Sequence, residues 1–219
     1  MLERITRREG ADLFYSWMAI AVSFAIIKIA PYGILGSIAA VTPVQGIIYF
    51  GIALVTVGIG FILHEIAHKF VAIHYGYLAE FRKDDVMLLI AVVMAVLAGF
   101  VFAAPGATVI YTKAHDERGI SRKEYGIVSA AGPVVNLLLC IPFAALFLFA
   151  GGLAAPTTAG NQLLMAIGLA GIQINAMIAT FNMLPISILD GNKVIAWSVP
   201  VFIVLIVASV AILFGSFSL

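Results

Sequence analysis

Charged residues and cysteine are both scarce in this chain of 219 residues. Only 11% of the residues are Asp, Glu, Lys or Arg, against roughly 25% in an average globular domain. The 12 basic and 11 acidic side chains leave a formal net charge of +1, which gives no basis for binding nucleic acid. Cys140 is the single cysteine, so an internal disulfide is excluded and this residue is expected to pack in an apolar environment.

What the chain has instead is long stretches of apolar sequence. Hydrophobic residues make up 63% of it, and its mean hydropathy is +1.13. A helix needs roughly 20 apolar residues to cross the hydrocarbon of a bilayer. The first apolar run follows a charged start and is too long for the core of a cleavable signal, so we expect a polytopic membrane protein that retains it. Six runs come near the required length, at about 14–35, 44–73, 86–105, 126–150, 162–182 and 194–218.

A cluster of ionisable side chains interrupts the second run. Residues 64–68 read His-Glu-Ile-Ala-His, and on a helix His64 and His68 project from one face at the spacing that lets two imidazoles share a zinc ion. Glu65 lies beside them, placed to take a proton from water bound to the metal. Ionisable groups are costly at membrane depth and mark function there. We therefore predict that this segment is the metal-binding helix of a catalytic site.

The distribution of basic residues distinguishes two topologies. If all six runs cross, the basic connection 106–125 lies outside, against the tendency of Lys and Arg to stay inside. If 86–105 dips in and returns to the same face, every basic residue except Lys28 falls on or near the cytoplasmic side. Lys28 lies late in the first run, from where its long side chain can reach the outer interface. We favour this second topology, which has five spans, an inside N-terminus and an outside C-terminus; an ordinary sixth span is the alternative.

The composition of 86–111 fits a re-entrant hairpin. Gly99, Pro105 and Gly106 interrupt the segment, and residues 108–111 are a β-branched and aromatic stretch that favours a strand. Irregular backbone at membrane depth needs protein or a water-filled cavity around it. We therefore predict an all-α polytopic membrane protein in one domain over residues 1–219. It has five to six transmembrane helices, with a membrane-embedded re-entrant or β-hairpin segment after the metal-binding helix.

A zinc site usually has a third protein ligand, and the sequence offers one candidate. Glu65 and Asp190 are the acidic residues that adjoin the apolar spans most closely, and Asp190 follows the fifth run. Pro185 breaks the helix before it, and Gly191 permits a tight approach just after it. In the five-span topology Asp190 and the two histidines lie towards the same leaflet, whereas in the six-span topology they face opposite leaflets.

Three motifs together resemble the site-2 protease family of intramembrane metalloproteases. They are His64-Glu65-x-x-His68, Asn182-x-x-Pro185-x-x-x-Leu189-Asp190-Gly191 and Ala131-Gly132-Pro133-Val134-Val135-Asn136. The resemblance covers about residues 44–193, which we take as the metal-binding core. The family's second proline after Pro185 is Ser187 here, a departure that concerns the shape of the loop. The chain leaves no room for a PDZ or CBS domain, so regulation by either is not expected.

This resemblance implies a role for each matching residue. One zinc ion would be bound by His64, His68 and Asp190, and Glu65 would be the catalytic base. Asn182 and Asn136 are implied near the substrate or the developing oxyanion, and for either residue the alternative is hydrogen bonding between helices of the bundle. Two further polar residues of the fifth run, Gln173 and Asn175, are expected to hydrogen-bond between helices instead.

The sequence thus predicts an intramembrane zinc metalloprotease that hydrolyses peptide bonds within or near transmembrane segments of membrane-protein substrates. Its partners would be such a substrate and the lipid bilayer, and the active site would open to the cytoplasm. The alternatives are a metal-ion transporter, a metal-binding protein without proteolytic activity, and a structural membrane protein with an inactive site. A transporter would need several ligand clusters along a path, and this chain has one, with a general base beside it.

The predicted topology can be tested with single cysteines in a Cys140→Ala background. We expect Ser121→Cys and Arg82→Cys to be protected from an impermeant maleimide in intact cells, because both positions lie in basic, cytoplasmic connections. Both should be labelled once the membrane is opened. Labelling of Ser121→Cys from outside would contradict the re-entrant course of 86–105 and separate Asp190 from the histidines.

Overall fold

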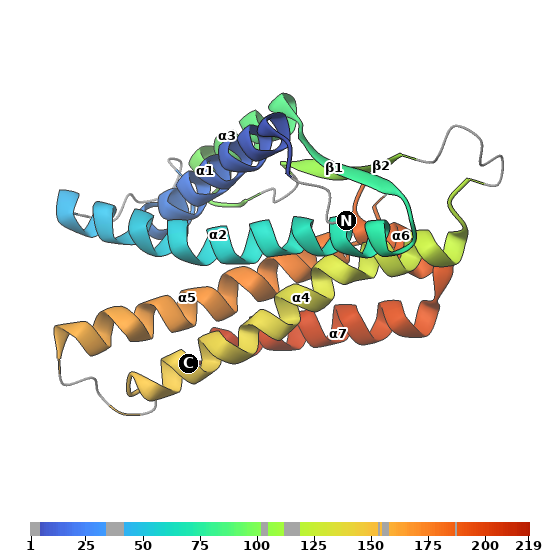
Figure 1. The fold of residues 1–219 in the computed structure, drawn as a ribbon. Coiled ribbons are helices and arrows are strands. Elements are labelled where there is room, and N and C mark those ends of the chain that lie inside the picture. The colour runs from blue at the N-terminus through green and yellow to red at the C-terminus, as the bar shows by residue number, and fades with distance from the viewer. Residues whose placement is uncertain are drawn as a thin grey trace.

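Five long apolar helices make up the body of the protein (Figure 1). The computed structural model describes residues 5–33, 42–101, 105–111, 119–152, 154, 158–186 and 188–219. In these ranges the long helices are α1 (Arg7–Ile29), α2 (Pro43–His74), α4 (Arg122–Phe149), α5 (Ala159–Asn182) and α7 (Val199–Ser216). The shorter elements there are the helices α3 (Asp85–Ala98) and α6 (Asp190–Trp197) and the strands β1 (Leu78–Lys83) and β2 (Gly106–Tyr111). Each long helix is apolar enough to cross a membrane, so this is a multi-pass membrane protein, as predicted.

Local sequence signals fix where two of these helices begin. The Thr42 hydroxyl accepts from the backbone N–H of Gln45, whose side chain accepts from the N–H of Thr42, and Pro43 takes the first helical position of α2. Ser121 and Glu124 form the same reciprocal cap at the start of α4. These caps set the residues at which α2 and α4, the two helices around the metal-binding motif, enter the bundle.

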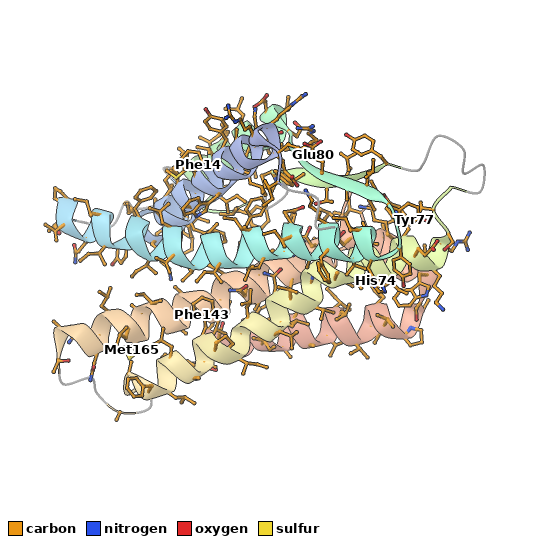
Figure 2. All side chains as sticks on the ribbon, viewed as in Figure 1. Phe14, His74, Tyr77, Glu80, Phe143 and Met165 are labelled. Carbon is orange, nitrogen blue, oxygen red and sulfur yellow. The ribbon has the colours of Figure 1, made fainter. Side chains whose placement is uncertain are left out.

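The long helices alternate in direction. α2 and α5 run toward the end of the molecule that carries β1, β2 and α6, here called the sheet end, whereas α1, α4 and α7 run away from it (Figure 1). Figure 2 shows His74, Tyr77 and Glu80 at the sheet end and Met165 toward the other end. α1 begins at the sheet end and α7 ends at the opposite end, as an odd number of spans requires. Among the described Lys and Arg residues, only Lys28 lies away from the sheet end.

The segment between β1 and β2 enters and leaves at the same end. α3 has 14 residues, so it is about 21 Å long and falls short of a bilayer core of about 30 Å. It ends at Gly99 in a left-handed conformation, packed so closely on the backbone of Pro31 that a side chain would clash. The chain then comes back to the start of α3. The N–H of Asp84, just before this helix, donates a hydrogen bond to the carbonyl of Pro105 over 2.9 Å. The re-entrant course was therefore predicted correctly, and 86–105 is not a sixth span.

Three boundaries differ from the prediction. The strand expected at 108–111 is present and begins at Gly106, but its antiparallel partner is β1, which the sequence analysis treated as a connection. The last apolar run is divided at Ser198, whose backbone is extended, because Pro200 lacks the N–H that a continuous helix would need there. α1 begins at Arg7, inside the charged start of the chain, because that start is packed against the sheet.

The charged start of α1 closes one edge of the sheet. Glu9 is fully buried, and its Oε2 lies 2.6 Å from Nζ of Lys69 on α2. The other carboxylate oxygen accepts from the backbone N–H of Phe81 in β1 over 3.2 Å. Burying a carboxylate is tolerable because both of its oxygens have donors. Glu9 thus ties α1 to α2, one residue beyond the metal-binding motif, and to the outer edge of β1.

Candidate metal centre

The two histidines and the aspartate that the sequence singles out come together at the sheet end. His64 and His68 are buried on α2, with ring centroids 4.6 Å apart. Asp190 is the first residue of α6, and its Oδ2 lies 3.4 Å from Nε2 of His64 and 3.2 Å from Nε2 of His68. Two ligands of a tetrahedral zinc ion, each about 2.0–2.1 Å from the metal, lie about 3.3 Å apart. These atoms are therefore spaced as ligands of one ion.

Helix α4 orients both imidazoles. Nδ1 of His64 lies 2.5 Å from Oδ1 of Asn136, and Nδ1 of His68 lies 2.7 Å from the carbonyl oxygen of Val128. Both oxygens are acceptors, so each Nδ1 carries a proton and donates it. Each Nε2 consequently keeps a lone pair that points at Asp190 and is available to a metal.

A glycine leaves the space in which an ion fits. Gly132 lies on α4, one helical turn from Val128 in one direction and one turn from Asn136 in the other. A Cβ atom at Gly132 would lie 2.5 Å from Nε2 of both His64 and His68. Two imidazoles and one carboxylate, with a fourth position left for water, are the donor set of catalytic zinc sites. The residues present therefore fit a zinc ion.

Asp190 reaches the histidines because the chain turns sharply after α5. That helix ends at Asn182, and a Cβ at Gly191 would lie 2.2 Å from the carbonyl oxygen of Met183, so a close backbone approach fixes the start of α6. A carboxylate binds a metal in its ionised form, so Asp190 would hold the ion as a carboxylate.

Glu65 lies on the same helix and faces the sheet. Its side chain is 8% exposed, and its Oε2 accepts a hydrogen bond of 2.8 Å from the hydroxyl of Thr108 in β2. Among the residues that the structure describes, the hydroxyl of Thr108 is the one hydrogen-bond donor to this carboxylate. A carboxylate so placed beside the ligands is suited to accept a proton in the reaction.

Asn136 lies behind the ligands. It is fully buried, and its Nδ2 donates to the carbonyl oxygen of Gly60 over 3.0 Å and to Oδ1 of Asn175 over 2.9 Å. Both of its N–H groups are therefore used within the fold. In this arrangement Asn136 supports His64 and has no free donor for an oxyanion, which differs from the role that the resemblance implied. Asn175 makes the contact between helices that the sequence predicted for it.

A small cavity joins the metal-binding cluster to Glu65. Its volume is about 90 Å³, and its walls are formed by α2, β2, α4, Asn182 and residues between 188 and 193. Asn182 lines it, while its Nδ2 donates to the carbonyl oxygen of Ile178 in its own helix over 3.0 Å. The predicted role of Asn182 near the substrate stays a prediction.

Two contacts of the site were missed by the sequence analysis. Thr108 was recognised as part of a strand, but nothing in a strand pattern says that its hydroxyl meets Glu65 from the neighbouring helix. Val128 contributes through its backbone carbonyl, which carries no residue signature at all. Of the other two histidines, His74 is exposed at the end of α2, and His115 lies outside the described residues.

The sequence of this chain is similar to that of a known protein over most of its length. Over 196 residues the chain is 36% identical to a protein of Methanocaldococcus jannaschii named "Putative zinc metalloprotease MJ0611", and the match covers 89% of this chain and 87% of that protein. The chain belongs to the same zinc metalloprotease family. No family profile matches the chain, and no solved structure matches it. Family membership and the His64, His68 and Asp190 cluster agree that zinc is the cofactor.

The space at Gly132 gives a direct test of the metal site. We expect Gly132→Ala to lower bound zinc well below about one ion per chain, because the added methyl group would occupy the position of the ion. Gly51→Ala is the matched control, since a Cβ there meets nothing within 4 Å. Elemental analysis of the purified, monodisperse variants measures the zinc. Stoichiometric zinc in Gly132→Ala would show that the ion lies elsewhere.

Proposed function

We propose that this protein is an intramembrane protease of the site-2 protease type, which hydrolyses peptide bonds within or near transmembrane segments of other membrane proteins. The observation that carries the proposal is the position of His64, Glu65 and His68. All three are buried on a helix that is long and apolar enough to cross a membrane. A hydrolytic site built at that place meets substrates that are themselves in the membrane.

The chemistry follows from the groups around the cavity. His64, His68 and Asp190 would hold a zinc ion, which would supply Lewis-acid chemistry and make water a nucleophile at neutral pH. Glu65 accepts a proton as this water attacks the peptide carbonyl, and it then passes the proton to the leaving amine. The hydroxyl of Thr108 holds the Glu65 carboxylate in one orientation throughout.

The hydrogen-bond register of the sheet shows which backbone groups of β2 face a free edge. Because the N–H of Phe81 donates to Glu9, it points away from β2, and the facing pair Phe81 and Thr108 is a non-hydrogen-bonded pair. Pairs of the two kinds alternate along an antiparallel ladder. The N–H and C=O of Thr108 and Ile110 therefore point to the free edge, whereas those of Val109 point to β1.

This free edge borders the site. Gly106, Thr108 and Ile110 all line the cavity that contains the metal ligands. A helical substrate has its backbone groups satisfied internally and must unwind before its carbonyl can be attacked. An unwound segment needs new partners for those groups, and strand addition to β2 supplies them next to Glu65.

Orientation and alternatives follow from the same structure. Because the described basic residues except Lys28 gather at the sheet end, we place this end and the opening of the site on the cytoplasmic side.

In the described part of the chain, the cluster of His64, His68 and Asp190 is the one group that could hold a metal ion. Transport would need a succession of such sites, so nothing here favours it.

The proposed activity is tested by comparing wild type with Glu65→Gln on single-span membrane proteins reconstituted in vesicles. We expect wild type to cleave within the membrane segment of a substrate, and Glu65→Gln to keep its zinc but lose at least about 100-fold in rate, since it loses the proton acceptor. Mass spectrometry of the products locates the cut. Cleavage that survives Glu65→Gln, or cuts confined to soluble segments, would contradict the proposal.

Strand addition predicts different effects for two neighbouring prolines. Ile110→Pro removes an N–H from the free edge, so we expect about tenfold slower cleavage of a membrane substrate with zinc content unchanged. Val109→Pro removes a donor to β1 instead, so we expect a lower melting temperature in detergent. Normal cleavage by a folded, zinc-loaded Ile110→Pro protein would rule out docking on this edge.

A further inference from the structure

Lys28 is an exposed cation beside apolar cavities, far from the metal centre. It lies in the last turn of α1, and its Nζ is 3.5 Å from Oε1 of Gln173 on α5. Among the described residues, no carboxylate forms an ion pair with it. The carbonyl end of α1 favours a positive charge but does not neutralise it. An exposed ammonium group at the edge of apolar side chains attracts an anion.

Apolar cavities lie on both sides of the contact between Lys28 and Gln173. The smaller one, about 250 Å³, lies among α1, α2 and α5, and the larger one, about 430 Å³, lies among α1, α5, α7 and the residues after α3. Both residues line both cavities. Exposed side chains of Phe100 and Phe217 border the larger cavity, so it opens on the outer surface of the bundle.

The larger cavity has the length of one lipid leaflet. Its wall on α5 extends from Ala170 to Phe181, about 16 Å at 1.5 Å per residue, and half of a bilayer core is about 15 Å. Its polar end is level with the end of α7, because Nε2 of Gln173 donates to the carbonyl oxygen of Ser216, in the last turn of α7, over 3.4 Å. The cavity therefore presents a cation at one end and an apolar channel along the rest of its length.

The apolar lining of the cavity suits a hydrocarbon chain. An α-helix is about 10–12 Å wide with its side chains. A single acyl chain is narrower and carries no backbone groups that need partners. One polar group, the hydroxyl of Thr180, is buried on this wall without a hydrogen-bond partner.

We propose that the larger cavity binds one phospholipid whose headgroup carries a net negative charge. The headgroup phosphate pairs with Lys28 and accepts a hydrogen bond from its ammonium group, while one acyl chain fills the space between α1, α5 and α7. The bound lipid neutralises Lys28 and closes the seam between these helices. This site is separate from the metal centre and does not depend on the proposed proteolysis.

The test is native mass spectrometry of the purified, zinc-loaded protein with phosphatidylglycerol and with phosphatidylcholine of the same chains. We expect wild type to retain one phosphatidylglycerol and to bind phosphatidylcholine much more weakly. Lys28→Gln should bind phosphatidylglycerol about tenfold more weakly, the effect of losing one charge-assisted hydrogen bond. Gln173→Glu should do the same, because its carboxylate would take the place of the phosphate beside Lys28.

Two controls separate this site from general attraction to lipid. Arg8→Gln removes the same charge from an exposed position at the sheet end and should leave phosphatidylglycerol binding within about twofold. Ala170→Phe, which fills the cavity, should weaken lipid binding while Lys28 is retained. Zinc content reports whether each variant has folded. Equal binding of phosphatidylglycerol by wild type and Lys28→Gln, or equal binding of the two lipids by wild type, would overturn the proposal.

Discussion

A carboxylate held against two imidazoles inside an apolar bundle is the constraint on which the rest of the structure depends. Removing an ionised group from water costs on the order of several kcal/mol, so every polar atom of such a cluster needs a partner. Asp190 faces the Nε2 atoms of His64 and His68, and the two Nδ1 atoms are bonded to α4. A metal ion bound by these three residues would neutralise the Asp190 carboxylate and give the lone pair of each Nε2 a partner.

α4 supports the two histidines with three different kinds of group. A backbone carbonyl at Val128, an absent side chain at Gly132 and an amide at Asn136 face the ligands along successive turns. The amide of Asn136 continues to Asn175 on α5, which donates in turn to the carbonyl of Gly171 over 2.8 Å. Three long helices are thereby aligned by one buried chain of hydrogen bonds, which apolar contacts in lipid would not align as specifically.

The two edges of the sheet differ, because one is closed by a side chain and the other is open. An open strand edge is normally a liability, because unpaired backbone groups recruit other chains. Here β1 is closed by the buried carboxylate of Glu9, while the free edge of β2 borders the cavity beside Glu65. The same strand holds Glu65 through Thr108, so under the proposed function the strand that would bind an extended substrate would also orient the base.

Much of this protein was determined by sequence features that act locally. Apolar run lengths fixed the membrane class, and the placement of basic residues selected five spans over six. Two histidines one helical turn apart share a face on any helix, so the metal-binding motif needed no tertiary information. Asp190 was found because carboxylates are rare near membrane spans and only one topology brings this one to the histidines.

Other features were decided only by the tertiary structure. The pairing of β1 with β2 joins segments separated by a helix, and neither strand's pattern names its partner. Asn136 was expected near the substrate, yet packing between α2, α4 and α5 surrounds it with acceptors and turns it toward His64. The contact of Thr108 with Glu65 likewise joins residues 43 positions apart. Side-chain roles of this kind depend on which elements meet, and that is settled only when the whole bundle packs.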